Sequence, residues 1–188
     1  MRRFALIIAA LLLSACGARE DSTLNESACA RSATREIAWT QGEVADVITT
    51  SAQGPSCAQA VVTFVARNAA GDPLWAFAST YYDMTVGGVA PEGAPAVTNE
   101  QMDTFLTSWA DATASRTGGL PQWREGVPTL TQSATTFAYD TPFERETYEM
   151  LRARDLPMIC YAAAVEATQC LIVDPASNAP TMIVAYGP

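Results

Sequence analysis

The chain has 188 residues, is 49% hydrophobic, carries a formal net charge of −9 and contains no histidine. All 11 basic residues are arginine, so sites that need histidine or lysine, such as Ser-His-Asp triads, Schiff-base lysines and histidine-rich zinc sites, cannot form within one chain. The acidic balance also disfavours nucleic acid, because Lys and Arg must displace counterions from phosphate. We therefore expect a globular acidic protein, and we lean toward a non-enzymatic function.

The first residues form a short leader. Arg2 and Arg3 precede an apolar run over 4–13, which is too short to span a bilayer and is typical of a secretory signal. The run ends in Leu13-Ser14-Ala15-Cys16, which resembles the lipobox of bacterial lipoproteins. The resemblance covers only residues 1–16, and no domain family is recognised in the rest of the chain.

This resemblance implies cleavage before Cys16 and acylation of that residue, which would anchor the protein stably to a membrane. Gly17 follows the cysteine, a pattern that resembles outer-membrane sorting. We therefore expect a cell-envelope protein that faces the periplasm from the outer membrane. An ordinary cleaved signal peptide and an uncleaved anchor are the alternatives.

The expected organisation is a signal peptide over 1–15, a lipid-anchored tether over 16–27 and one globular domain over 28–188. Without residues 1–15, nine arginines face 20 acidic residues, a net charge of −11. Cys29, Cys57, Cys160 and Cys170 remain after Cys16, and an even number of cysteines in an exported chain predicts two disulfides. Of the three possible pairings we expect Cys29–Cys57 and Cys160–Cys170, because each closes a local loop.

The N-terminal half of this domain reads mainly as β structure. Residues 29–40 are ambiguous between helix and strand, and 44–50 predict a strand. Apolar runs over 60–67 and 74–82 flank turn residues at 68–73 and predict a hairpin. The Gly- and Pro-rich stretch 86–97 predicts a loop.

Two amphipathic helices are expected in the middle of the chain. Thr98 and Gln101 form a capping-box pattern, and the following apolar spacing predicts a helix that ends before Gly118. Residues 130–139 favour a strand. A second capping-box pattern predicts another helix that starts at Thr141 and stops at Pro157. The pattern places three apolar side chains on one face of this helix: Phe143, Met150 and Leu151.

The C-terminal residues predict three strands over 158–165, 169–174 and 181–186, joined as an antiparallel meander. Strand blocks at both ends with two helices between them favour an α+β fold, with antiparallel sheets packed against the helices.

Few residues stand out as functional candidates. Trp123 lies in a loop beside Arg124, a pair typical of binding hot spots, although a loop tryptophan can also fold back over the core. If the pair is a binding site, Trp123→Ala should leave thermal stability nearly unchanged. Glu144, Glu146 and Glu149 read as a solvated helix face, and Asp83 as a polar residue at a strand end. We assign no catalytic residue, metal or cofactor.

The sequence thus favours a lipid-anchored envelope domain that binds a cationic envelope protein or a small ligand. Three alternatives stay open: an inhibitor of a basic hydrolase such as lysozyme, a carboxylate-dependent envelope hydrolase, and a scaffold subunit of an envelope assembly.

Overall fold

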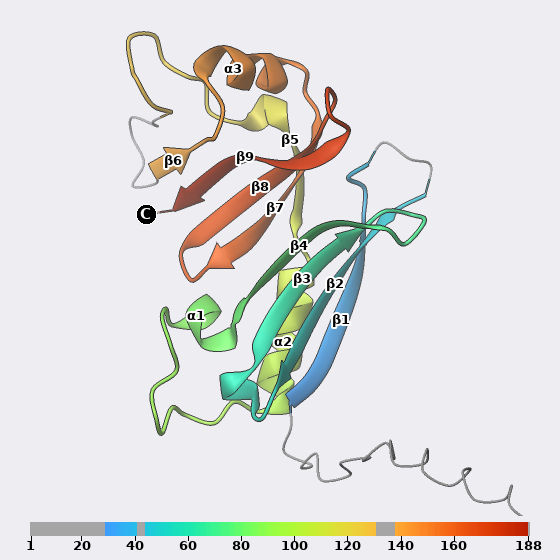
Figure 1. Cartoon of the computed structure of the whole chain (residues 1–188), viewed down its shortest axis with the longest axis vertical. Helices are drawn as coiled ribbons and strands as arrows, with labels where there is room; N and C mark the ends of the chain where they lie inside the picture. The colour runs from blue at the N-terminus through green and yellow to red at the C-terminus, as the bar shows by residue number, and fades with distance from the viewer. Residues whose placement is uncertain (1–28, 41–43, 131–137, 188) are drawn as a thin grey trace, which may run out of the picture.

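A computed structural model describes residues 29–40, 44–130 and 138–187, and these form two antiparallel sheets and three α-helices (Figure 1). The fold is therefore α+β, as predicted. The N-terminal sheet has the strand order β1-β2-β3-β4, and the C-terminal sheet has the order β5-β7-β8-β9-β6. Cys16 and the leader lie outside the described residues. Within the described ranges, no helix has the length and hydropathy that crossing a bilayer requires.

The N-terminal sheet is a meander of β1 (Cys29–Ile37), β2 (Asp46–Gly54), β3 (Val61–Arg67) and β4 (Pro73–Thr80), with the short 3-10 helix η1 (Cys57–Gln59) before β3. The ambiguous segment at its start is thus a strand.

The predicted hairpin between β3 and β4 is confirmed. Asn68 Oδ1 accepts hydrogen bonds from the amides of Ala70 and Asp72, and Gly71 adopts a left-handed φ of 88°. The second strand ends two residues early, because Tyr81 and Tyr82 start helix α1 (Tyr81–Thr85), which Thr80 caps.

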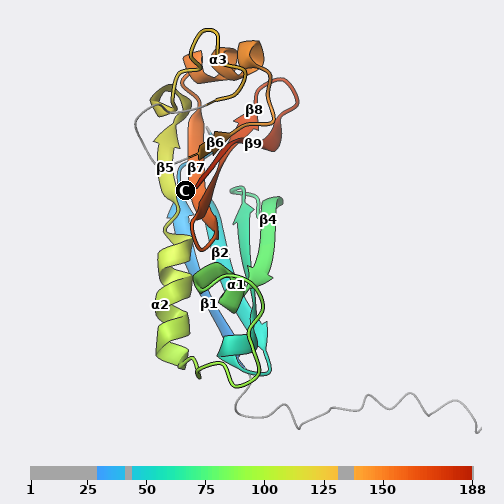
Figure 2. The same cartoon turned by 90° about the vertical axis from the view of Figure 1, so that its left-hand side faces the viewer.

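Helix α2 (Asn99–Ala110) covers one face of the N-terminal sheet, against β1 and β2 (Figure 2). The predicted capping box is confirmed: the Gln101 amide donates to Thr98 Oγ1 and the Thr98 amide donates to Gln101 Oε1. The helix ends before Gly118, as predicted, at Ala110, and β5 (Thr113–Arg116) and the 3-10 helix η2 (Thr117–Gly119) follow it. The pairing of β5 with β7 ends the helical conformation.

Helix α3 (Arg145–Ala153) corrects the second helix prediction. The expected capping box at Thr141 does not form, because α3 begins only at Arg145, with Glu144 at the N-cap position. The Thr141 hydroxyl donates to the Ile183 carbonyl, and its oxygen accepts from the Phe143 amide. Met150 is 51% exposed rather than part of the apolar face, and Tyr148 is buried together with Leu151. The strand expected over 130–139 is described only as β6 (Ala138–Asp140), since 131–137 lie outside the described residues.

The C-terminal meander is confirmed, with β7 (Pro157–Ala164), β8 (Ala167–Asp174) and β9 (Ala179–Gly187). Both predicted disulfides are present. One joins the start of β1 to η1 through Cys29 and Cys57, and the other joins directly opposed residues of β7 and β8.

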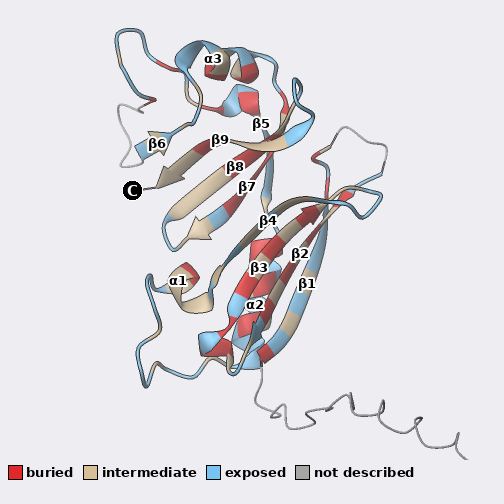
Figure 3. Cartoon of the chain, viewed as in Figure 1, coloured by how far each residue is buried: buried red, intermediate tan, exposed pale blue. Residues whose placement is uncertain are grey.

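An aromatic core joins the two sheets. Figure 3 shows buried residues on strands of both sheets. Phe64 of β3 stacks on Tyr161 of β7, with ring centroids 4.6 Å apart. Trp75 of β4 donates its indole N–H to the Tyr161 hydroxyl over 3.0 Å, and that hydroxyl donates to Gln169 on β8. Because these polar groups are paired across the junction, the sheets are held in one relative orientation. A second cluster lies between the C-terminal sheet and α3.

Candidate ligand-binding groove

Trp123 is part of the second core cluster, so the alternative reading, in which the loop folds back over the core, is correct. Its side chain is 8% exposed and meets Tyr148 edge to face at 5.9 Å. The indole N–H donates to the Val127 carbonyl, and the Trp123 amide donates to Glu149 Oε1. Arg124 beside it is exposed. The two residues therefore do not form an exposed hot-spot pair, because the aromatic member is packed inside.

The carboxylates noted in the sequence have structural partners. Asp83 accepts hydrogen bonds from the Ser79 hydroxyl and the Gly88 amide. Besides the Trp123 amide, Glu149 accepts a hydrogen bond from Arg152. Glu144 and Glu146 are exposed at the start of α3. The described part of the chain contains no group of three or more His, Cys, Asp or Glu residues that could hold a metal ion.

An open groove of about 330 Å³ lies where the C-terminal end of α2 meets the C-terminal sheet. Its floor is a cross-strand row on three adjacent strands, in which Ala162 of β7 is opposite Thr168 of β8, and Thr168 is opposite Tyr186 of β9. The row is open on this side because β5 pairs with β7 only as far as Cys160, so β7 and β8 continue to their hairpin beyond β5. Because Ala162 and Thr168 have small side chains, the groove is open above these two positions.

One wall of the groove comes from α2 and the segment after it. Trp109 is fixed there, because its indole N–H donates to the Ala162 carbonyl over 2.9 Å. Phe105 lies one turn earlier, with its ring 5.5 Å from that of Trp109. Tyr186 ends the floor row on β9, and its ring lies 5.2 Å from that of Tyr139. Trp109 itself is only 5% exposed, so the accessible aromatic surface of the groove comes from the half-buried Phe105 and Tyr186.

The polar groups of the groove are mainly hydroxyls. Ser108, Thr113 and Thr168 line it, and among the described residues Asp111 is the only carboxylate in the lining. Asp111 Oδ1 lies 3.2 Å from Arg35 Nε, and both side chains are well exposed. Burial raises the pKa of the Tyr161 phenol at the back of the groove, so it remains neutral and bonded at physiological pH.

This lining suits binding more than acid–base chemistry. Hydrolysis of a glycosidic bond by two carboxyl groups requires that the two groups face each other across the site. The described lining of the groove contains a single carboxyl group, Asp111, which already lies near Arg35. Aromatic faces beside hydroxyl groups can contact a ligand that has an apolar face and hydrogen-bonding edges.

The groove was not anticipated from the sequence. Its residues come from α2, β5, β7, β8 and β9, and only pairing brings them together. The one sequence feature that pointed to this region was Trp109, near the end of the predicted helix. No protein-family model, curated protein or solved structure matches this chain.

Proposed function

We propose that this protein is a lipid-anchored binding protein of the bacterial cell envelope, held at the outer membrane through acylated Cys16 and facing the periplasm. The leader and Leu13-Ser14-Ala15-Cys16 support the anchor. The groove at the end of α2 supports the binding role.

The groove's composition favours a neutral saccharide as ligand. A pyranose ring offers an apolar C–H face to aromatic side chains and hydroxyls to Ser, Thr and carboxylate groups. The groove volume of about 330 Å³ is at the small end of ligand sites, and its open shape suits one ring of a longer chain. The observation that carries the proposal is the presence of two half-buried aromatic side chains, Phe105 and Tyr186, beside hydroxyl groups in one groove. Envelope glycans are ligands of this chemistry.

Filling the groove tests the binding role. Ala162 is exposed on the groove floor, so Ala162→Trp should occupy the space without altering the buried core. Ala76→Trp is the matched control, because Ala76 is an exposed strand alanine on β4, away from the groove. Amide chemical shifts are recorded during titration with tri-N-acetylglucosamine. We expect shifts around Thr168 and Tyr186 in the parent and the control, and none in Ala162→Trp. A parent without shifts, or an unaffected Ala162→Trp, contradicts the proposal.

The anchor is tested separately, by mass spectrometry of the protein made in its own host. The expected N-terminus is an acylated Cys16, and Cys16→Ser should move the protein from the membrane to the soluble fraction. An unmodified Cys16 still joined to Ala15 contradicts lipidation, whatever the groove binds.

The net charge favours a second candidate, an inhibitor of a basic hydrolase. From Cys16 onward the chain carries a charge of −11, which would steer a cationic protein toward it. Purified protein in excess is mixed with lysozyme, and lysis of cell walls is followed by turbidity. Undiminished lysis rejects lysozyme as the partner, and inhibition that survives Ala162→Trp would place the contact outside the groove.

A further inference from the structure

Exposed valines occur at the start of β3 and in the loop that follows α1. Val61 at the start of β3 is 48% exposed, and Val89 in the loop after α1 is 88% exposed. Both border a shallow hollow together with Ala78. Val86, in the same loop, is 61% exposed. We call Val61, Val86 and Val89 the valine patch. Apolar side chains held in solvent at this level mark a contact surface when they occur together.

Local structure holds the loop in this position. Asp83 accepts hydrogen bonds of 2.9 Å from the Gly88 amide and from the Ser79 hydroxyl, which ties the loop to β4. Gly87 and Gly88 have φ values of 95° and 81°, a backbone conformation that residues with a side chain rarely adopt. The carboxylate at the edge of the hollow is thus engaged by neighbouring donors, and the remaining lining is uncharged.

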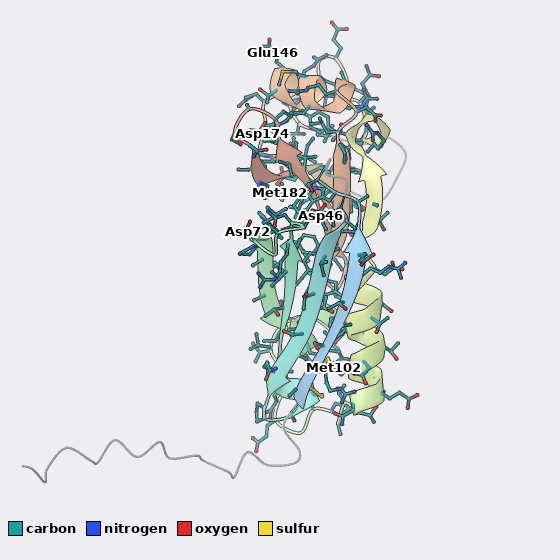
Figure 4. All side chains as sticks on the ribbon, turned by 90° about the vertical axis from the view of Figure 1, so that its right-hand side faces the viewer. Asp46, Asp72, Met102, Glu146, Asp174 and Met182 are labelled. Atoms are coloured by element: carbon teal, nitrogen blue, oxygen red, sulfur yellow. A yellow bond between two sulfur atoms is a disulfide. The ribbon has the colours of Figure 1, made fainter. Side chains whose placement is uncertain are left out.

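The valine patch lies at the same end of the molecule as the entry of the chain into the fold. Val61 follows η1, which the disulfide joins to Cys29 at the start of β1 (Figures 1 and 2). In Figure 4, Met102 of α2 lies toward this end, and Glu146 of α3 lies at the opposite end. Twelve residues separate Cys16 from Cys29, a reach of at most about 45 Å.

We propose that this end of the protein rests on the lipid bilayer, with the valine patch at the boundary between headgroups and acyl chains. The proposal rests on the proposed lipid anchor. Three valines would bind a bilayer weakly as a free protein, but a tether makes the contact intramolecular and raises its effective concentration. Among the residues that the structure describes, no basic residue lines the hollow, and Glu92 and Glu100 are exposed in the adjoining loop and helix start. The surface therefore fits zwitterionic lipid rather than anionic lipid.

This orientation also places the groove. It lies at the C-terminal end of α2, whose 12 residues span about 18 Å from the end nearest the bilayer. The groove would then open into the periplasm above the lipid surface, where a glycan can reach it.

The test attaches the chain to a bilayer without relying on biosynthesis. Residues 16–188 include every described residue, and Cys16 is the one cysteine outside the two disulfides. It is coupled to a maleimide lipid in phosphatidylcholine vesicles with brominated acyl chains, which quench nearby indoles. Val89→Trp reports on the patch. Met150→Trp is the matched control, because Met150 is an exposed apolar residue on α3 at the far end.

After subtraction of the parent signal, we expect quenching of the added indole in Val89→Trp and none in Met150→Trp. Adding Val61→Asp and Val86→Asp to Val89→Trp should abolish the quenching. Equal emission from the two tryptophan variants, or quenching that survives both aspartates, overturns the proposal. Because the coupling is chemical, either result concerns the patch alone, whereas the mass of native Cys16 decides the anchor.

Discussion

Trp123→Ala should strongly destabilise the protein. The indole is almost fully buried in the cluster beneath α3, against Tyr148. Truncating a buried tryptophan to alanine costs about 3–5 kcal/mol, since apolar burial is lost and a cavity remains. Loss of the hydrogen bond from the Trp123 indole to the Val127 carbonyl adds at most about 1 kcal/mol. Val127 is half-buried, so water can hydrogen-bond to its carbonyl in the variant and recover part of this energy. We expect a loss of about 4 kcal/mol in the free energy of unfolding.

The measurement is urea unfolding followed by circular dichroism, with both disulfides intact. A loss of this size corresponds to a fall in Tm of roughly 10 °C in a domain of this length. Trp123→Phe keeps an aromatic ring against Tyr148 and should lose about 1–2 kcal/mol. Gln122→Ala, at an exposed neighbouring position, should stay within about 0.5 kcal/mol of the parent. If Trp123→Ala matches Gln122→Ala, the loop is not packed as described and Trp123 returns to the candidates for a binding surface.

Three further predictions follow from buried and charged groups. Asp46 is fully buried and accepts hydrogen bonds from two backbone amides and one hydroxyl, so Asp46→Ala should cost about 3 kcal/mol or more in urea unfolding, and Asp46→Asn about 1 kcal/mol. A tolerated Asp46→Ala would show that these amides find other acceptors. Replacing Cys29 and Cys57 together by alanine should cost about 3.5 kcal/mol, because the disulfide closes a loop across 28 positions; an unchanged unfolding midpoint would show that the bond is dispensable. The hydrogen bond from Arg116 lowers the pKa of Asp155, so the stabilisation is complete above the unfolded-state value near 3.9 and disappears as the pH falls through the lower folded-state value. In Arg116→Ala, the pKa of Asp155 followed by NMR should rise, and an unchanged titration would contradict this pairing.

Local sequence signals predicted the elements whose stabilising contacts are also local. The capping box of α2 needs only Thr98 and Gln101, three residues apart, and both hydrogen bonds form. The β3–β4 turn similarly uses Asn68 and its near neighbours. The same pattern failed at Thr141: its hydroxyl donates to Ile183, a strand residue 42 positions away, its oxygen accepts from the Phe143 amide, and the helix starts only at Arg145. A motif of this kind predicts correctly when no distant group competes for the side chain.

The Trp123 prediction shows a related limit. A tryptophan between proline and glycine residues carries no periodic signal, so neither burial nor exposure follows from its neighbours. Burial was decided by Tyr148 and Glu149 on a helix more than 20 residues later. Asp46 was missed for a similar reason, since its partners Trp39 and Thr40 lie across a strand connection (Figure 4 labels Asp46). Acidic residues near strand starts are common, and only burial marks this one as structural.

Trp109 and Tyr161 belong to both the groove and the aromatic core, and this determines how binding can be tested. Trp109 borders the groove, but it also packs against Phe64 in the aromatic core and donates to the Ala162 carbonyl. A wall fixed by the core does not have to become ordered when a ligand binds, which favours affinity in a small site. The same sharing means that removing Trp109 would weaken the fold and the groove together. A loss of binding in Trp109→Ala would therefore carry no information about the ligand. Adding a side chain at the exposed Ala162 changes the groove and leaves the core packing intact, so the binding proposal depends on that variant.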